Sequence, residues 1–184
     1  MRTAKIWPTV AATAAMVGLL ATPAAAAPTD DTDSTFEVLV GTLDVVTPAT
    51  ADLGSGAPGG TITSALGTVS VSDTRAAADA SWTASVTATD FQTGGGTPEE
   101  TVLASEIDYW SGPALTTTGT GTFTPGQPTA GDAEALDSTT PLDAFTHTGG
   151  TGSNTATWNP TLVVNVPLDS IAGEYTGTVT HSVA

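Results

Sequence analysis

The stretch TVSVSDTRAAADASWTASVTATDF, residues 68–91, decides the fold of this chain. Val69, Val71, Asp73 and Arg75 alternate with Ser and Thr, so in an extended chain these four side chains share one face. After a short Ala-rich connection, the same alternation resumes at Trp82 and continues to residue 88. The stretch therefore predicts two consecutive half-buried β-strands.

The segments on either side of this pair carry similar patterns. Alternating apolar and hydroxyl-bearing residues recur at 61–66, 101–110, 155–166 and 175–183, separated by loops rich in Gly and Pro. Residues 36–46 (FEVLVGTLDVV) form a β-branched run broken by Gly41, which predicts one buried strand with a bend or two short strands. We expect an all-β, immunoglobulin-like antiparallel β-sandwich of a single domain, with long loops rich in Gly, Pro and Thr.

The first residues have the pattern of an export signal. A basic start with Arg2 and Lys5 precedes an apolar segment and a small, Ala-rich end, which predicts a secretory signal peptide over residues 1–26. Cleavage there leaves 158 of the 184 residues. We interpret residues 27–35 as an acidic flexible arm and residues 36–184 as the folded domain. The expected location is extracellular or associated with the cell wall.

The charge of the exported chain is one-sided. Once Arg2 and Lys5 are removed, Arg75 is the one cationic Lys or Arg side chain against 19 carboxylates, a formal net charge of −18. Nucleic acids and anionic membranes are therefore excluded as partners, because both require clusters of Lys and Arg. The acidic surface either keeps a β-rich protein soluble or binds divalent cations. No residue spacing marks a metal site, and no cofactor is predicted.

Arg75 is the first candidate for a binding role. A guanidinium two residues after Asp73 and seven before Trp82 can hold a carboxylate in a two-pronged hydrogen bond and stack on an indole ring. One interpretation makes Asp73, Arg75 and Trp82 contacts of a ligand. The other makes Arg75 a structural clamp on the turn between two strands. The sequence leaves both open.

The aromatic residues divide between the core and a possible binding surface. Trp82 and Trp158 stand at the apolar positions of their strands, which predicts core packing. Tyr109 and Trp110 are adjacent, so in a strand they point to opposite sides and one of them should lie near the surface. Both are candidate platforms for stacking on a sugar. His181 shares a face with apolar neighbours, which predicts a partly buried imidazole.

The sequence lacks the motifs of common enzymes. Nucleophile elbows, phosphate-binding loops and metalloprotease helices are all missing. Glu106 and Asp108 offer a pair of carboxylates, but a glycosidase is defined by the separation of its acids across a cleft. We therefore expect a protein that is not an enzyme.

Two segments resemble the signatures of the WxL surface domain. In residues 69–84 the motif V-S-V-S-D-T-R followed by S-W-T-A is similar to the first signature, a D-x-R turn followed by Trp-x-Leu. Residues 172–183 (AGEYTGTVTHSV) look like the second, a strand led by Tyr that ends in another Trp-x-Leu. Ala84 stands at the first Leu position, and His181 and Val183 stand at the second Trp and Leu. The chain thus resembles a divergent, actinobacterial type of the family.

This resemblance implies a non-catalytic β-sandwich that binds the cell envelope without a covalent link. Asp73, Arg75 and Trp82 match the first signature, and peptidoglycan or another wall polymer is the implied ligand, with other envelope surface proteins as further partners. The leading hypothesis is a secreted wall-binding protein. The alternatives are a structural subunit of an extracellular surface layer and a secreted hydrolase.

Overall fold

The computed structural model describes residues 28–184. Among these residues there are fourteen β-strands, three single-turn 3-10 helices and no α-helix. The strands are β1 (Leu43–Val46), β2 (Thr61–Ala65), β3 (Val69–Ala77), β4 (Trp82–Ala88), β5 (Phe91–Gln92), β6 (Thr101–Val102), β7 (Ile107–Trp110), β8 (Ala114–Thr118), β9 (Thr122–Pro125), β10 (Glu134–Ala135), β11 (Leu142–Thr148), β12 (Gly152–Trp158), β13 (Thr161–Asn165) and β14 (Val179–Val183). The 3-10 helices are η1 (Pro98–Glu100), η2 (Ala104–Glu106) and η3 (Ala130–Asp132).

The described chain divides after Phe36. Residues 28–36 are exposed and contain no strand, and Glu37–Ala184 forms a separate compact unit, the β unit. The predicted signal peptide, residues 1–26, lies outside the described residues and stays a prediction. No helix in residues 28–184 is long and apolar enough to cross a membrane.

The central pair of strands follows the predicted alternation. In β3 the side chains of Val69, Val71 and Asp73 are completely buried, while the intervening Ser side chains are partly exposed. In β4 every second residue from Trp82 to Ala88 is buried. The period of two in the sequence thus predicted correctly which face of each strand enters the core.

The first layer consists of two short sheets placed end to end. One has the order β1-β3-β12-β8 and the other β10-β7-β13-β2, and all neighbours are antiparallel. Successive strands β2 and β3 pair with successive strands β13 and β12, so the two sheets continue one another. Strands β12 and β13 are separated at Asn159 and Pro160, whereas the sequence predicts one unbroken strand from 155 to 166. Pro160 has no N–H to donate, so the ladder stops there.

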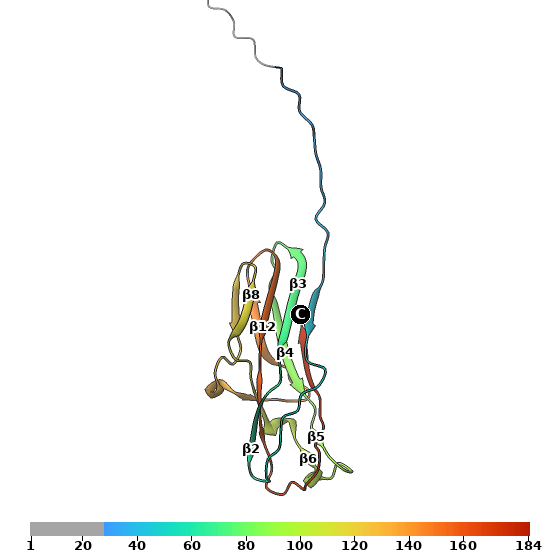
Figure 1. The fold of residues 1–184 in the computed structure, drawn as a ribbon, viewed down its shortest axis with the longest axis vertical. Coiled ribbons are helices and arrows are strands. Elements are labelled where there is room, and N and C mark those ends of the chain that lie inside the picture. Colours follow the sequence, from blue (N-terminus) through green and yellow to red (C-terminus); the bar gives the residue numbers. More distant parts are fainter. Residues whose placement is uncertain (1–27) are drawn as a thin grey trace, which may run out of the picture. The chain divides into compact units, whose positions relative to one another are not determined.

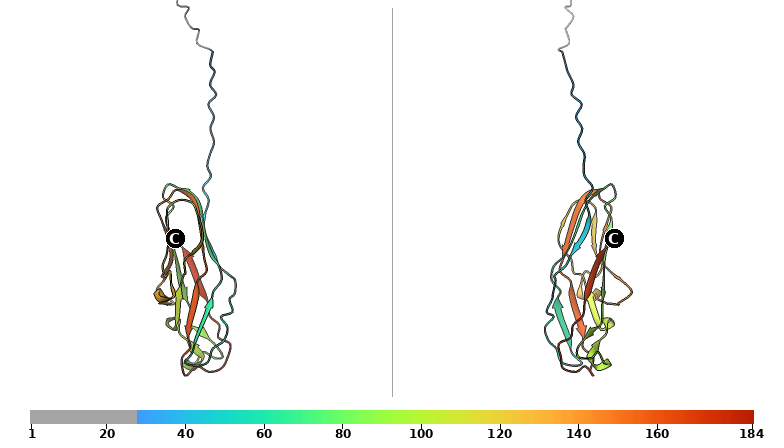
Figure 2. Two further views of the ribbon diagram at one scale, coloured as in Figure 1. Left: turned by 60° about the vertical axis from the view of Figure 1, so that its left-hand side comes forward. Right: turned by 90° about the vertical axis from the view of Figure 1, so that its right-hand side faces the viewer.

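The second layer has the order β14-β4-β11-β9, with the two-stranded sheet β5-β6 beyond the end of β4. Figures 1 and 2 show the two layers facing one another within the β unit. Across the interface, the rings of Trp158 from the first layer and Phe145 from the second stack with centroids 4.9 Å apart. The all-β class is therefore confirmed, and the arrangement is consistent with a β-sandwich. The immunoglobulin-like connection remains a prediction.

The prediction of a buried strand across residues 36–46 was wrong for its first half. Only Leu43–Val46 forms strand β1, and the side chains of Phe36, Val38, Leu39 and Val40 are 69–92% exposed. The chain joins the sheet at Gly41, where the N–H donates to the Thr74 carbonyl oxygen at 3.0 Å. A Cβ at residue 41 would meet Thr74 at less than 3 Å, which explains the glycine.

Candidate functional site

The last part of β3, next to the turn into β4, contains a two-pronged ion pair. Arg75 donates from Nε to Asp73 Oδ1 at 2.9 Å and from Nη2 to Asp73 Oδ2 at 2.8 Å. The Arg75 N–H also donates to Asp73 Oδ1, and Nη2 donates to the Ser81 carbonyl oxygen at 2.9 Å. One guanidinium therefore links the end of β3 to the residue that precedes β4.

The local backbone brings these groups together. Ala76 has a φ of +54°, a left-handed conformation that a residue with a Cβ rarely adopts. Ala76 stands within β3, directly after Arg75 and one residue before the strand ends at Ala77. Across the turn, Asp79 Oδ1 accepts hydrogen bonds from the backbone N–H and the hydroxyl of Ser81. The turn is thus fixed by hydrogen bonds at both sides.

Below the ion pair lies a buried polar network. Asn154 Nδ2 donates to Asp73 Oδ2 at 3.3 Å and lies 3.4 Å from the Ala80 carbonyl oxygen, while Asn154 Oδ1 accepts from Trp82 Nε1 at 2.7 Å. His147 Nδ1 lies 2.8 Å from the same Ala80 oxygen. The network connects β3, β4, β11 and β12, and therefore both layers.

The structure therefore brings the candidate residues Asp73, Arg75 and Trp82 together, but at the edge of the core and not on an open surface. Asp73 is fully buried, Trp82 is 3% exposed, and only the Arg75 side chain reaches solvent, at 33%. Hydrogen bonds from Arg75 lower the pKa of the Asp73 carboxyl, and that carboxyl raises the pKa of Arg75. Both carboxylate oxygens and the indole N–H already have partners, so the geometry favours the clamp interpretation.

The two remaining candidates point apart as the sequence predicted. Tyr109 is fully buried, and its hydroxyl accepts from Trp158 Nε1 at 3.1 Å and lies 3.2 Å from His181 Nε2. Trp110 is half-buried on the opposite side of β7, and its buried Nε1 has no protein partner. The structure does not bring Tyr109 and Trp110 together with Asp73, Arg75 and Trp82 at one surface.

His181 completes a second buried cluster. Because the Tyr109 hydroxyl accepts from Trp158, its own proton can be donated to His181 Nε2. The other ring nitrogen, Nδ1, is buried without a partner, and burial lowers the pKa of His181 to about 4. Burial also raises the pKa of Tyr109. The imidazole is therefore buried more completely than the sequence predicts, with 8% of the residue exposed.

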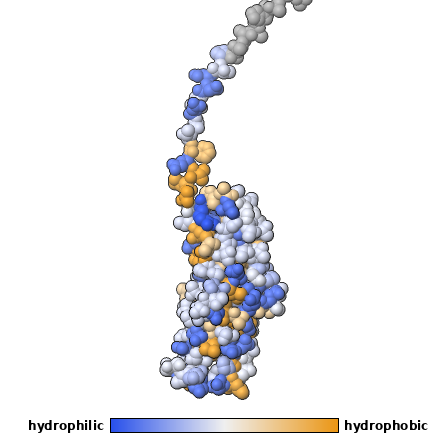
Figure 3. All heavy atoms as spheres, turned by 180° about the vertical axis from the view of Figure 1, so that it is seen from behind, coloured by the Kyte–Doolittle hydropathy of each residue, from blue (hydrophilic) through white to orange (hydrophobic). Residues whose placement is uncertain are grey.

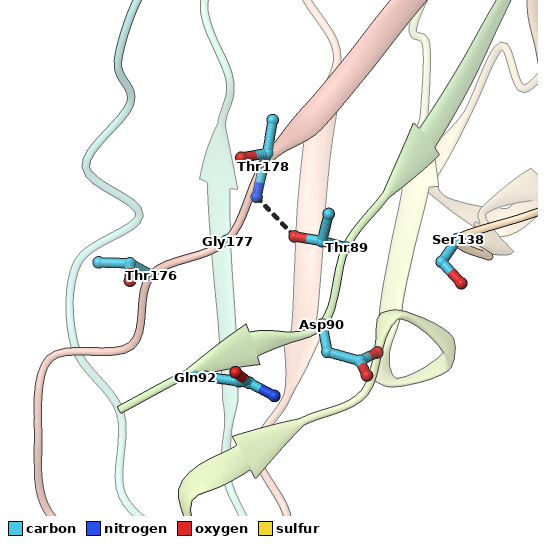
Figure 4. Close-up of a pocket in the computed structure, with 7 residues that line it drawn as sticks. All are labelled: Thr89, Asp90, Gln92, Ser138, Thr176, Gly177 and Thr178. Carbon is cyan, nitrogen blue, oxygen red and sulfur yellow. Dashed lines mark hydrogen bonds between the residues drawn. The ribbon is translucent and has the colours of Figure 1, made fainter. Parts of the chain in front are cut away.

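A polar hollow lies on the surface where β4, β5 and the start of β14 meet (Figure 4). Its volume is about 560 Å³. The lining side chains are hydroxyls, one amide and one carboxylate, from Thr89, Asp90, Gln92, Ser138, Thr176 and Thr178, together with Gly177. Sequence reasoning missed this hollow, because its residues come from three separate parts of the chain.

The walls of the hollow are held by specific contacts. The Thr89 hydroxyl accepts the N–H of Thr178 at 2.9 Å, and Asp90 Oδ1 accepts the N–H of Ala104 at 2.8 Å. A Cβ at Gly177 would meet the ring of Phe91 at 2.4 Å, so the backbone there rests directly on the aromatic ring. These contacts leave Asp90 Oδ2, the Gln92 amide and the Ser138 hydroxyl as groups able to bind a polar ligand.

The carboxylates of Glu106 and Asp108, which the sequence offered as a pair, have different surroundings in the structure. Glu106 lines a second hollow beside Asp169, whereas Asp108 Oδ2 accepts a hydrogen bond from Asn165 at 3.0 Å. Within residues 28–184, no three His, Asp or Glu side chains gather closely enough to hold a metal ion.

Comparison with models of known protein families and with curated proteins gave no match for this sequence.

Proposed function

We propose that this protein is an exported, non-catalytic binding protein that holds a hydroxyl-rich polymer of the cell envelope in the hollow at Asp90 and Gln92. The polar lining of that hollow carries the proposal. Its hydroxyl, amide and carboxylate groups can exchange hydrogen bonds with sugar hydroxyls, and none of its lining residues is cationic. The export-signal pattern and the resemblance to the WxL domain support the same function.

The charge of the chain is compatible with a neutral ligand. A formal charge of −18 after signal cleavage disfavours phosphate-rich polymers, whereas the uncharged glycan strands of peptidoglycan carry no such penalty. Peptidoglycan is therefore the envelope polymer that we propose as ligand. The clamp at Asp73, Arg75 and Trp82 then serves stability, and binding depends on a different part of the β unit.

Sedimentation with purified sacculi tests this function. We expect the chain that begins at Ala27 to sediment with sacculi, and the triple variant D90N/Q92A/S138A to bind at least about tenfold more weakly, since each lost hydrogen bond contributes about 1 kcal/mol. The matched control T63A/T117A removes exposed hydroxyls from β2 and β8, away from the hollow, and should sediment like the unmodified chain. A chain that stays in the supernatant at low and moderate salt, with or without calcium, contradicts the proposal.

A further inference from the structure

Residues 36–40 (FEVLV), which we call the apolar arm, lie where the described chain enters the β unit, and none of them forms a strand. Phe36 is 92% exposed, Val38 69%, Leu39 76% and Val40 83%. The composition is typical of a strand, since aromatic and β-branched residues favour pleated, half-buried surfaces. Such a segment, left uncovered in water, indicates an interaction that the single chain does not provide. Figure 3 shows apolar side chains gathered where the arm meets the β unit.

The arm is not paired with the sheet that β1 joins. Strand β1 pairs with β3 as far as Asp73, and the last backbone bonds in this direction join Gly41 and Thr42 to Thr74. Strand β3 itself continues to Ala77 and pairs there with Gly152 of β12, but it contains the left-handed Ala76, and none of residues 36–40 forms a strand beside it.

A second apolar surface lies at the opposite end of the β unit. The arm joins beside the β3–β4 turn, while this surface lies beyond the far end of β4, around η1, η2 and the loop that follows β13. Exposed Leu103 (51%) lines a hollow of about 470 Å³ there, and exposed Leu168 (82%) and Ile171 (47%) lie in the adjoining loop after β13, outside the lining of the hollow. Pro98 and Pro167 also line the hollow. We call these five residues the apolar notch.

Both surfaces are apolar and exposed, and they lie at opposite ends of the β unit. We propose that the apolar arm of one copy packs into the apolar notch of a second copy, so that the protein assembles head to tail. A contact between different patches at opposite ends leaves one free arm and one free notch on every complex that does not close into a ring. Growth can therefore continue beyond a dimer. This inference does not depend on the polar hollow or on the proposed ligand.

Charge predicts how the contact responds to salt. Glu37 lies within the arm, and Glu106 and Asp169 line the hollow of the notch, so two approaching copies repel one another. Salt screens this repulsion, with a Debye length that falls to about 3 Å at 1 M, while apolar burial is retained. Association should therefore strengthen as salt is added. The same acidic residues disfavour an anionic membrane as the occupant of the arm.

Analytical ultracentrifugation of the chain that begins at Ala27 tests the assembly. We expect the sedimentation coefficient to rise with protein concentration, and to rise further with added NaCl. V38D/V40D places charge in the arm, and L103D places charge in the notch; each should weaken association at least about tenfold. L115D is the matched control, because Leu115 is 57% exposed on β8, outside both surfaces. Circular dichroism should show an unchanged β spectrum for every variant.

Mixing the two variants gives the sharpest result. The V38D/V40D variant keeps an intact notch, and the L103D variant keeps an intact arm, so the first can bind the second. The arm and the notch that remain free in this complex are both altered, so no further copy can bind. The mixture should therefore form a 1:1 complex and nothing larger. An unmodified chain that stays monomeric at every concentration and salt overturns the proposal, as does association that survives L103D. Binding of the arm to neutral phosphatidylcholine vesicles, in place of self-association, also overturns it.

Discussion

Asn154 and Trp82 are joined across the two layers by a hydrogen bond of 2.7 Å from the indole N–H to the side-chain oxygen, although 72 residues separate them in sequence. The same asparagine donates to buried Asp73. A single amide therefore satisfies the indole N–H of Trp82 and the carboxylate that Arg75 holds. Buried polar groups require such partners, since an unpaired one costs about 1 to 3 kcal/mol.

Replacing this amide tests the network. N154A leaves the Trp82 N–H without its partner and removes one donor from Asp73, so we expect the free energy of unfolding to fall by about 2 to 4 kcal/mol. Chemical denaturation measures the change. S153A is the control, because Ser153 is the exposed neighbour on the same strand and should alter stability by less than about 0.5 kcal/mol. Equal stability of the two variants would contradict the assigned role.

Replacing Arg75 distinguishes the clamp from a ligand contact. R75A leaves the buried Asp73 carboxylate without its cation, and we expect a loss of about 2 to 3 kcal/mol, reduced from that of a fully buried pair because Arg75 is partly exposed. Sedimentation with sacculi, measured at a temperature where the variant is folded, should be unchanged. R75K keeps the charge but loses the two-pronged geometry, so its free energy of unfolding should lie between those of R75A and the unmodified chain. Weakened binding at full stability would instead assign Arg75 to a ligand site.

Acid should destabilise the protein through His181. Burial lowers its pKa to about 4 in the folded protein, from 6.5 in an unfolded chain. The unfolded state therefore binds the proton first, and stability falls as the pH drops from about 6.5 to about 4, by about 3 kcal/mol in total. Thermal unfolding across this range measures the slope. In H181Q, which lacks the titrating ring, the slope should be smaller; an equal slope would assign the effect to other groups.

The carboxylate of Asp73 acts in a lower pH range. Its pKa is lowered from 3.8 by Arg75, so its contribution is present above that value and is lost as the pH falls through the lower, folded-state pKa. Loss of stability between pH 6.5 and 4 therefore does not come from this ion pair.

A side chain at residue 177 should distort the polar hollow. G177A places a Cβ within 2.4 Å of the Phe91 ring, so the ring or the backbone must move. We expect a loss of about 1 to 3 kcal/mol in stability together with weaker binding to sacculi. G95A is the control, because a Cβ there would meet Glu100 Oε2 at 3.5 Å, an ordinary contact. Unchanged binding by a folded G177A variant would show that the hollow is not the binding surface.

The sequence was sufficient for features that depend on neighbours along the chain. The alternation from Val69 to Asp73 and from Trp82 to Ala88 predicted two strands and their buried faces, and the positions of Trp158 and His181 predicted their burial. Each of these follows from the two-residue period of a strand, which needs no knowledge of the partner strand.

Features that depend on distant segments were not predictable in the same way. The polar hollow joins residues 89–92 to Ser138 and to residues 176–178, and no local pattern states that these segments meet. The arm at residues 36–40 has the composition of a buried strand, but whether it is covered depends on pairing with a distant segment, and in the structure the pairing of β1 with β3 ends before the arm. The interruption at Pro160 is a local feature, since a proline without an N–H can end a strand whatever lies beside it.

The position of Arg75 also bears on resistance to proteolysis. In residues 28–184 it is the one Lys or Arg, so proteases that cut after basic residues have a single bond to attack, between Arg75 and Ala76. That bond lies within strand β3, and the guanidinium that such a protease must insert in its specificity pocket is held by Asp73 and Ser81. Cleavage by trypsin-like enzymes therefore requires β3 to open first, and the folded chain should persist in surroundings where such enzymes are abundant.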